Sequence, residues 1–300
     1  MYSQIDSNKR RSVILMIISV VFIIGLGYVF SRAQGDTTYS LMWMAAIFSL
    51  GSTSVSYFQG DKIALWTSGA RQITEEENKY VYRLIDNLCI TSGLPVPKIY
   101  IIDDPAINAF ATGRNPQLAS IAITSGAIQK LKNEELEGVI AHELSHVQNY
   151  DIRFMTLVAV LVGAIAIMAN IFLRSGSVFG GRRSNKDGEG NSMMAVFMII
   201  GVVLAILSPL IAQLIKFAIS RQREYLADAS GSLLTRYPEA LASALEKIQQ
   251  DNLPLTRASA ATAHLFFANP FQGKSLKNLF STHPPIEERI KRLRELTSKA

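Results

Sequence analysis

Four long stretches of the chain carry no charged side chain and consist mainly of apolar residues. Their lengths are 20, 24, 20 and 26 residues, and they are Ser12–Ser31, Thr37–Gly60, Phe154–Leu173 and Gly190–Ile215. A helix of about 20 apolar residues spans the hydrocarbon core of a bilayer. The pattern therefore predicts two membrane-spanning helical hairpins. The alternative, buried helices of a large soluble core, is harder to exclude for the second pair than for the first.

Flanking charges orient the first hairpin. Lys9, Arg10 and Arg11 precede it, whereas its internal connection carries only Arg32 against Asp36. The positive-inside rule places the N-terminus in the cytoplasm, and the chain returns there after the second span. A signal peptide cleaved near Arg32 is the alternative. A retained anchor is favoured, because the apolar run is long for a signal peptide and a second span follows at once.

The internal connection of the second hairpin conflicts with simple alternation. It carries Arg174, Arg182, Arg183 and Lys186, although alternation places it outside the cell. Either the first hairpin dominates the topology or the second hairpin does not fully cross, and the sequence leaves this open. A run rich in Gly and Ser, Ser175–Ser192, predicts a mobile loop within this connection.

The polar stretches Asp61–Arg153 and Arg221–Ala300 flank the second hairpin. Thr74-Glu75-Glu76-Glu77 is a capping box that predicts the start of a helix, and Ser92-Gly93-Leu94-Pro95 ends that helix. Asn133 is the predicted cap of another helix. Runs of β-branched and aromatic residues predict three strands, which are Lys98–Ile102, Asn108–Thr112 and Leu118–Thr124.

The composition narrows the class of protein. Hydrophobic residues make up 49% of the chain and charged residues 18%, which excludes a disordered chain and a coiled coil. A single cysteine, Cys89, excludes a disulfide framework and a Cys-rich metal site. The net charge of +6 suits an anionic membrane surface as well as nucleic acid. The mean hydropathy of +0.20 favours the membrane.

The helix predicted from Asn133 contains His142-Glu143-Leu144-Ser145-His146. Histidines four residues apart lie on one helical face, so both imidazoles can reach one zinc ion, with Glu143 beside them as a general base. The metzincin pattern is excluded, because Asn149 and Ile152 stand where it needs Gly and His. The alternative is a pair of surface histidines, which the apolar flanks of the helix disfavour.

A catalytic zinc ion needs a third protein ligand. The candidates are His264, His283 and the downstream carboxylates Glu224 and Asp228, which lie four residues apart after the fourth apolar segment. One carboxylate can bind the metal while the other accepts a ring N–H from a metal-binding histidine. The alternative is a solvated helix whose carboxylates are surface charges.

Several separated motifs occur in the order found in one family. After the His-Glu-x-x-His motif come Glu224-x-x-x-Asp228 and Thr282-His283-Pro284-Pro285, and Asn108-Ala109-Phe110-Ala111-Thr112-Gly113 precedes it. In these motifs and in its four hydrophobic segments the chain resembles the HtpX-type membrane zinc metalloproteases, relatives of the CAAX prenyl proteases. The resemblance implies a mainly α membrane protein with a small β-sheet, in which a hydrophobic hairpin interrupts a gluzincin-like metallopeptidase domain.

The resemblance also implies a division of the chain and a role for single residues. The parts are an N-terminal hairpin (1–60), the first part of the metalloprotease domain (61–153), a second hairpin (154–220) and the second part of the domain (221–300). The implied roles are zinc ligands for His142, His146 and Glu224, general base for Glu143, hydrogen-bond partner of a ligand for Asp228, substrate-binding edge strand for Asn108, Ala109 and Phe110, and oxyanion stabilisation for His283 and Arg289. For His283 a packing role before the Pro-Pro turn stays open, and for Arg289 a salt bridge on a helix surface. His264 matches no motif of the family and is interpreted as structural.

The implied function is that of a zinc metalloendopeptidase in the bacterial inner membrane, with one Zn²⁺ per chain. It would cleave misfolded or damaged membrane proteins at the cytoplasmic face, in quality control and the stress response. The expected partners are membrane-protein or unfolded polypeptide substrates, the lipid bilayer and other quality-control proteases, and not nucleic acid. The alternatives are a prenyl protease and a catalytically silent zinc-binding scaffold. A transporter is disfavoured, because the four segments carry no Asp, Glu, Lys, Arg or His.

The spacing of the motifs restricts where the metal lies. Two apolar segments separate His146 from Glu224, so the hairpin between them crosses the membrane twice or not at all. Both cases leave the site on the side of Asp61. Phe154 begins the third segment eight residues after His146, and Ile215 ends the fourth nine residues before Glu224. At 1.5 Å per helical residue, the metal is expected on the order of 10–15 Å from the bilayer edge.

Overall fold

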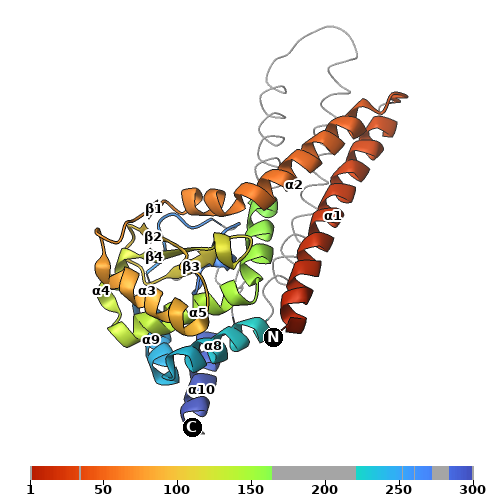
Figure 1. Cartoon of the computed structure of the whole chain (residues 1–300). Coiled ribbons are helices and arrows are strands. Elements are labelled where there is room, and N and C mark those ends of the chain that lie inside the picture. The colour runs from red at the N-terminus through yellow and green to blue at the C-terminus, as the bar shows by residue number, and fades with distance from the viewer. Residues whose placement is uncertain are drawn as a thin grey trace.

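The protein is described from a computed structural model (Figure 1). The structure describes residues 2–33, 35–163, 221–251, 253–259, 261–271 and 284–298. The predicted segment Gly190–Ile215, the second half of Phe154–Leu173, the connection Ser175–Ser192 and His283 lie outside these residues. The division of the chain at residue 220 therefore stays a prediction.

The first two apolar segments form two long helices packed side by side, α1 (Tyr2–Ala33) and α2 (Ser40–Thr67) (Figure 1). Between them the Asp36 carboxylate accepts hydrogen bonds from the N–H groups of Thr38 (2.8 Å) and of Ser40 (2.7 Å), the first residue of α2. The stretches Ile5–Val29 and Ser40–Thr67 are long and apolar enough to cross a bilayer. Large apolar side chains on both helices are exposed, which suits contact with lipid.

Both helices extend beyond the charge-free stretches that predict them. Helix α1 already includes the basic cluster Lys9–Arg11, and α2 continues past Asp61 and Lys62 to Thr67. The last turns of α2 bury Ala64 and Leu65 against the sheet. The second helix is therefore continuous from the apolar segment into the core of the globular part.

A four-stranded sheet has the order β1-β2-β4-β3, with β2 and β4 parallel and the other pairs antiparallel. The strands are β1 (Ala70–Gln72), β2 (Lys98–Ile102), β3 (Ala109–Thr112) and β4 (Ser120–Thr124). Three of them match predicted strands, whereas β1 is too short to give a sequence pattern. The start predicted at Leu118 is wrong, because Asn115 caps a 3₁₀ turn, η1 (Pro116–Leu118), before the strand.

Two helix starts differ from the prediction. The Glu77 carboxylate accepts the N–H of Thr74 (2.8 Å) but closes only a turn, and α3 (Lys79–Ser92) is capped instead by Asn78. Helix α5 (Asn133–Gln148) begins one residue earlier than a cap at Asn133 implies, because Glu135 reaches back to the N–H of Lys132 (2.7 Å). The hydrogen bond of the predicted capping box is thus present without starting a helix, and the predicted cap at Asn133 is wrong.

The remaining described helices are α4 (Ser125–Lys130), a helix over residues 151–163, α8 (Arg221–Thr235), α9 (Pro238–Asp251), η2 (Ala263–Leu265) and α10 (Ile286–Thr297). Helices predominate and the sheet is small, as the predicted fold class requires.

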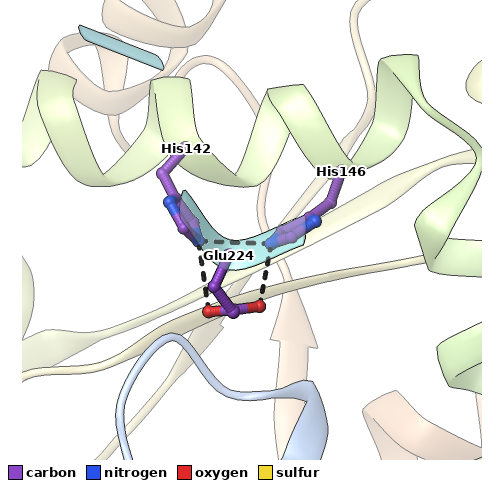
Figure 2. A group of neighbouring side chains, drawn as sticks. All are labelled: His142, His146 and Glu224. Atoms are coloured by element: carbon purple, nitrogen blue, oxygen red, sulfur yellow. Dashed lines mark hydrogen bonds and ion pairs between the residues drawn. The ribbon is translucent and has the colours of Figure 1, made fainter. Parts of the chain in front are cut away.

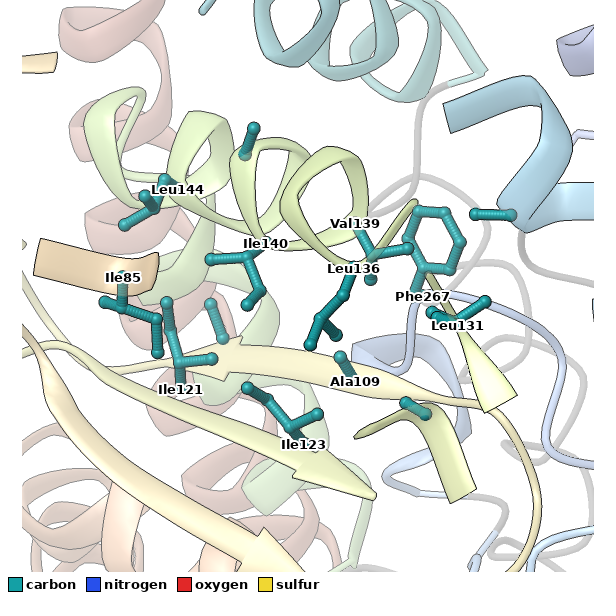
Figure 3. Packing of buried hydrophobic residues seen from close by; sticks show 14 of the residues in the cluster. Ile85, Ala109, Ile121, Ile123, Leu131, Leu136, Val139, Ile140, Leu144 and Phe267 are labelled. Atoms are coloured by element: carbon teal, nitrogen blue, oxygen red, sulfur yellow. The ribbon is translucent and has the colours of Figure 1, made fainter. Parts of the chain in front are cut away.

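The main core lies between the sheet and α5 (Figure 3). Leu136, Ile140 and Leu144 recur at helical spacing on α5 and pack over Ile121 and Ile123 of β4. The other face of the sheet is covered by the end of α2 and by residues 265–266. Both layers fix α5 relative to β3, and the two elements that carry the candidate site are thereby held together.

Candidate metal centre

Helix α5 presents His142 and His146 one turn apart, and α8 brings Glu224 to face them (Figure 2). A close approach of α5 and α8 depends on Gly231, because a Cβ atom there would lie 2.9 Å from the backbone nitrogen of His142. The side chains are buried, with exposed fractions of 1% for His142, 5% for His146 and 1% for Glu224. The structure thus brings together three residues that the sequence separates by 82 positions.

The distances in this cluster suit a single metal ion. The two Nε2 atoms of His142 and His146 are 3.2 Å apart, and the Glu224 oxygens lie 3.6 Å from the His146 Nε2 and 4.0 Å from that of His142. Ligand atoms about 2.0–2.1 Å from one tetrahedral ion are roughly 3.4 Å apart. Two imidazole nitrogens this close need a shared proton or a shared cation. Among the described residues, these three form the group of metal-ligating side chains close enough to hold an ion.

A carboxylate and a buried arginine support His142. The His142 Nδ1 lies 2.9 Å from Asp228 on α8. Arg289 of α10 in turn binds both oxygens of Asp228, with Nε at 2.9 Å and Nη2 at 2.7 Å. Arg289 is only 1% exposed, which excludes the surface salt bridge that the sequence left open. The ring of His142 therefore donates to Asp228 and turns the Nε2 lone pair towards Glu224.

A second carboxylate, Asp151, supports His146, and the sequence analysis missed it. The His146 Nδ1 lies 3.1 Å from Asp151, whose other oxygen accepts hydrogen bonds from Asn8 of α1 (2.7 Å) and Arg223 of α8 (3.1 Å). Asn8 also donates to the carbonyl of Asn149 (2.9 Å). Asp151 follows the end of α5, so no helical spacing relates it to His146. A signal existed only in the polar run Asn149-Tyr150-Asp151 between two apolar helices.

Glu143 lies beside the cluster and is bound to strand β3. Its carboxylate accepts the backbone N–H of Ala111 (2.8 Å), and the side chain is 2% exposed. Strand β3 is one of the two edge strands of the sheet, and it includes the predicted substrate-binding residues Ala109 and Phe110. Asn108 directly precedes β3, and its backbone pairs with Thr124 of β4.

The cluster contains more carboxyl groups than guanidinium groups, a composition that a bound cation would balance. Glu143, Asp151, Glu224 and Asp228 supply four carboxylates, against the two guanidinium groups of Arg223 and Arg289.

These surroundings move the pKa values of the site. Burial lowers the pKa of His142 to about 4, although Asp228 acts in the opposite direction. Burial also disfavours a charged His146, but the hydrogen bond to Asp151 and the charges of Glu224, Asp151 and Glu143 outweigh it and raise the pKa to about 9.

The two acids respond in opposite senses. Burial, and the charge of Glu224 with it, raises the pKa of Glu143 to about 8, against His146, the Ala111 N–H and Arg289, which lower it. Burial also acts to raise the pKa of Asp228, but Arg289 and His142 prevail and lower it to about 2. Glu143 is thus the carboxylate of the pair that exchanges a proton near neutral pH, the property a general base needs. A bound cation would lower its pKa.

His264 lies apart from the cluster, buried in η2 with its Nε2 2.9 Å from the carbonyl of Met155. His283 is outside the described residues.

Two histidines one turn apart on a helix, a distant glutamate and a neighbouring carboxylate define a metallopeptidase of the gluzincin kind. The chain belongs to peptidase family M48, which matches residues 75–297. It is 44% identical over 296 residues to a protein called protease HtpX homolog from Tropheryma whipplei (strain Twist), a match that covers 99% of this chain and 98% of the relative. A protein of the same name from Dictyoglomus turgidum is 43% identical, and the match covers 98% of this chain and 94% of that protein.

A solved structure shares the fold. The crystal structure of S. mikatae Ste24p aligns with a TM-score of 0.52 at 18% identity, covering 98% of this chain and 67% of the other. The predicted resemblance to HtpX-type metalloproteases and the predicted fold class are confirmed. The protein is a metallopeptidase of the membrane.

Proposed function

We propose that this protein is a zinc endopeptidase that cleaves membrane proteins and unfolded polypeptides at the cytoplasmic face of a bacterial inner membrane. The observation that carries the proposal is the convergence of His142, His146 and Glu224 beside the buried carboxylate of Glu143. Membership of peptidase family M48 supplies the reaction class, which is peptide hydrolysis. The substrates, the metal and the membrane face are the parts proposed.

Zinc is the metal that this donor set fits best. Two imidazole nitrogens and one carboxylate oxygen are the ligands of many catalytic zinc sites, in which a fourth position stays open. Zinc held by His142, His146 and Glu224, one ion per chain, would polarise the scissile carbonyl and increase the acidity of water.

The proton transfers and the positioning of the metal ligands are carried out by side chains of the protein. Glu143, whose carboxylate lies beside the metal ligands, takes a proton from the attacking water and delivers it to the leaving amine. Asp228 and Asp151 each hold one histidine ring by its Nδ1. Arg289 keeps Asp228 ionised and in place, and we retain for Arg289 and His283 a role in stabilising the oxyanion.

The position of α1 supports a cytoplasmic site. Because Asn8 is hydrogen-bonded to Asp151, the cluster lies beside the N-terminal end of α1 (Figure 1), which supports a position on the N-terminal side of the membrane. The basic residues Lys9, Arg10 and Arg11 in the same turns of α1 are typical of cytoplasmic flanks. A protease held there meets the cytoplasmic ends and loops of membrane proteins. This location fits a role in membrane-protein quality control and stress response, together with other proteases of that system.

Two other functions use the same cluster. A prenyl protease would cut lipidated tails by the same chemistry, and a silent scaffold would bind membrane proteins without cutting them. Comparing cleavage of a farnesylated peptide with cleavage of an unfolded membrane protein separates the first alternative, and we expect the unfolded protein to be the better substrate.

The main experiment compares the detergent-purified, zinc-loaded protein with its Glu143→Gln variant on casein. We expect the variant to retain zinc and to lose at least about a hundredfold in kcat, the size of a general-base contribution. Glu137→Gln, on the same helix but away from the cluster, serves as the matched control and should cut normally. Equal cleavage by Glu143→Gln and the unaltered protein would show that Glu143 is not the base.

A further inference from the structure

The outer edge of β3, beside Glu143, is occupied by a segment of the chain itself. The N–H of Phe267 donates to the carbonyl of Ala109 (2.8 Å). The side-chain amide of Asn108 then binds Ala268 at two points, accepting from its N–H (3.2 Å) and donating to its carbonyl (3.0 Å). The first is a backbone–backbone contact of the kind that an extended peptide makes when it adds to a sheet edge. The other two bind the backbone of Ala268 through a side chain.

The contacts follow an antiparallel register. Asn108 is paired with Ala268 and Ala109 with Phe267, and the rings of Phe110 and Phe266 meet at a centroid distance of 5.0 Å. Three successive residues of the segment thus match three residues of the edge in reverse order. The residues before Phe266 form η2 and leave the edge, so the match begins at that residue.

The ring of Phe267 fills a closed pocket next to the metal cluster. It is 1% exposed and meets the His142 ring edge-to-face, with centroids 4.9 Å apart. The Arg289 guanidinium lies over the ring at 4.7 Å and donates to the Phe267 carbonyl (3.2 Å). The ring belongs to the same apolar cluster as Val139 and Leu131 (Figure 3). This pocket holds a large apolar side chain, and the Arg289 guanidinium binds the carbonyl of the residue in it.

We propose that Phe267 and Ala268 are an internal stand-in for substrate, and that the pocket of Phe267 is a subsite for an aromatic or large aliphatic residue of the polypeptide to be cleaved. This inference rests on the proposed protease function and names the substrate class of the same site. The segment covers the edge of β3 that a substrate needs. Its presence therefore explains both the burial of the site and the occupied subsite.

The register also assigns the side of the scissile bond. Glu143 is bound to Ala111, two residues along β3 from the partner of Phe267. In an antiparallel arrangement the residues before Phe267 point towards Ala111 and Glu143. The base therefore lies on the N-terminal side of Phe267, and the pocket takes the residue that follows the cleaved bond.

The burial of the site requires that something move before a polypeptide can enter. His142, Glu143 and Glu224 are each exposed by 2% or less. Phe267 and Ala268 make the contacts that a substrate would need, so displacement of these two residues uncovers Ala109 and the pocket together. An internal competitor of this kind raises the apparent KM without changing the chemical step.

The first test is a size series at position 267. Phe267→Leu and Phe267→Ala weaken the internal occupant in steps, so KM for a peptide substrate should fall in that order, by about tenfold for Ala if roughly a tenth of the molecules are open. Metal content and kcat should stay near those of the unaltered protein. Leu245→Ala, which removes an equally buried side chain of the same core on α9, is the control and should leave KM unchanged. Equal KM values across the series would overturn the proposal.

The second test uses the segment as a free peptide, Leu-Phe-Phe-Ala-Asn-Pro, corresponding to residues 265–270. It should bind the Glu143→Gln protein, and about tenfold more tightly when Phe267→Ala is also present, as measured by fluorescence polarisation. The same peptide carrying Phe267→Asp should not bind. Among cleavable peptides, those with Phe or Leu after the scissile bond should exceed those with Asp or Gly by at least about tenfold in kcat/KM.

The two readouts separate this inference from the proposed function. Peptide binding that strengthens in Phe267→Ala without turnover in any protein would sink the protease assignment and keep the subsite. The inference would be wrong if the unaltered protein cleaved substrate, the free peptide did not compete, and the residue after the scissile bond did not affect kcat/KM. Residues 266–268 would then be a permanent part of the core.

Discussion

The two histidines of the cluster are supported by carboxylates in different surroundings. The His142 ring is hydrogen-bonded to Asp228, which accepts two hydrogen bonds from Arg289 of α10. His146 is backed by Asp151, whose partners are Arg223 and the amide of Asn8 on α1. One support is built within the globular part, whereas the other includes a residue at the beginning of a membrane helix.

This difference teaches that the first apolar helix is more than an anchor. A simple tether would contact the globular part only through its linker. Here α1 reaches the hydrogen-bond partner of a histidine in the candidate metal cluster, and α2 contributes Ala64 and Leu65 to the core over the sheet. The metal centre and the membrane helices are therefore one folded unit, and the two supports should respond differently to substitution.

The largest effect is expected at the Asp228 support. Asp228→Ala leaves the guanidinium of Arg289 buried without its main partner and frees the His142 ring. Breaking a buried pair costs about 3–5 kcal/mol, and loss of a histidine's supporting carboxylate costs about 10–100-fold in metal affinity. Thermal unfolding and a competitive zinc titration measure the two effects.

The control for this change is an exposed ion pair made by another arginine of α10, Arg294. Glu239→Ala on α9 removes one of the two surface carboxylates that pair with Arg294, and such pairs contribute about 0–1 kcal/mol. If Asp228→Ala were no more destabilising than Glu239→Ala, the buried pair of Asp228 and Arg289 would not contribute the stability expected of it.

A smaller effect is expected at the Asp151 support. In Asp151→Ala the His146 ring loses its acceptor, so zinc affinity should fall about tenfold. The free energy of unfolding should fall by only about 1–3 kcal/mol, because the Arg223 side chain is 12% exposed and can turn towards water. The same two measurements apply, with Asp151→Asn as the conservative variant, since its amide oxygen still accepts a hydrogen bond. Loss of more stability than in Asp228→Ala would reverse the ranking.

The sequence predicts the elements of this site better than it predicts their supports. His142, Glu143 and His146 follow from helical spacing, and Glu224 and Asp228 from spacing together with a family resemblance. Two of the long helices could be predicted from the apolar segments, because the length of a segment and its lack of charge are properties of the local sequence. The starts of α3 and α5 were shifted, since several neighbouring residues compete as caps and packing selects one of them.

Contacts across the chain were beyond sequence reasoning. Asn8 lies 143 residues before Asp151. The sequence around Asn8, a polar residue near the start of an apolar run, does not indicate which carboxylate its side chain binds. The burial of Arg289 was equally hidden, because a surface arginine and a buried one look alike in a helix rich in charges. The occupation of β3 by Phe267 depends on tertiary register, to which Leu265-Phe266-Phe267 contributes only apolar bulk.

The smallest effect, and the one most specific to α1, is expected at Asn8. Asn8→Ala removes one donor from Asp151 while Arg223 remains, so a loss of about 1 kcal/mol in stability and a few-fold loss in zinc affinity is expected. Asn8→Asp should be worse than Asn8→Ala, because it places a like charge 2.7 Å from the Asp151 carboxylate, where the amide stood. Zinc titration in detergent measures both.

The control is Asp6→Ala, an exposed position two residues away on the same helix, which should change neither quantity. This pattern distinguishes a hydrogen bond from a general loosening of α1, since loosening would make Asn8→Ala and Asn8→Asp equivalent. If Asn8→Ala matched Asp6→Ala and the unaltered protein in zinc affinity, α1 would act only as an anchor. The support of His146 would then rest on Arg223 alone.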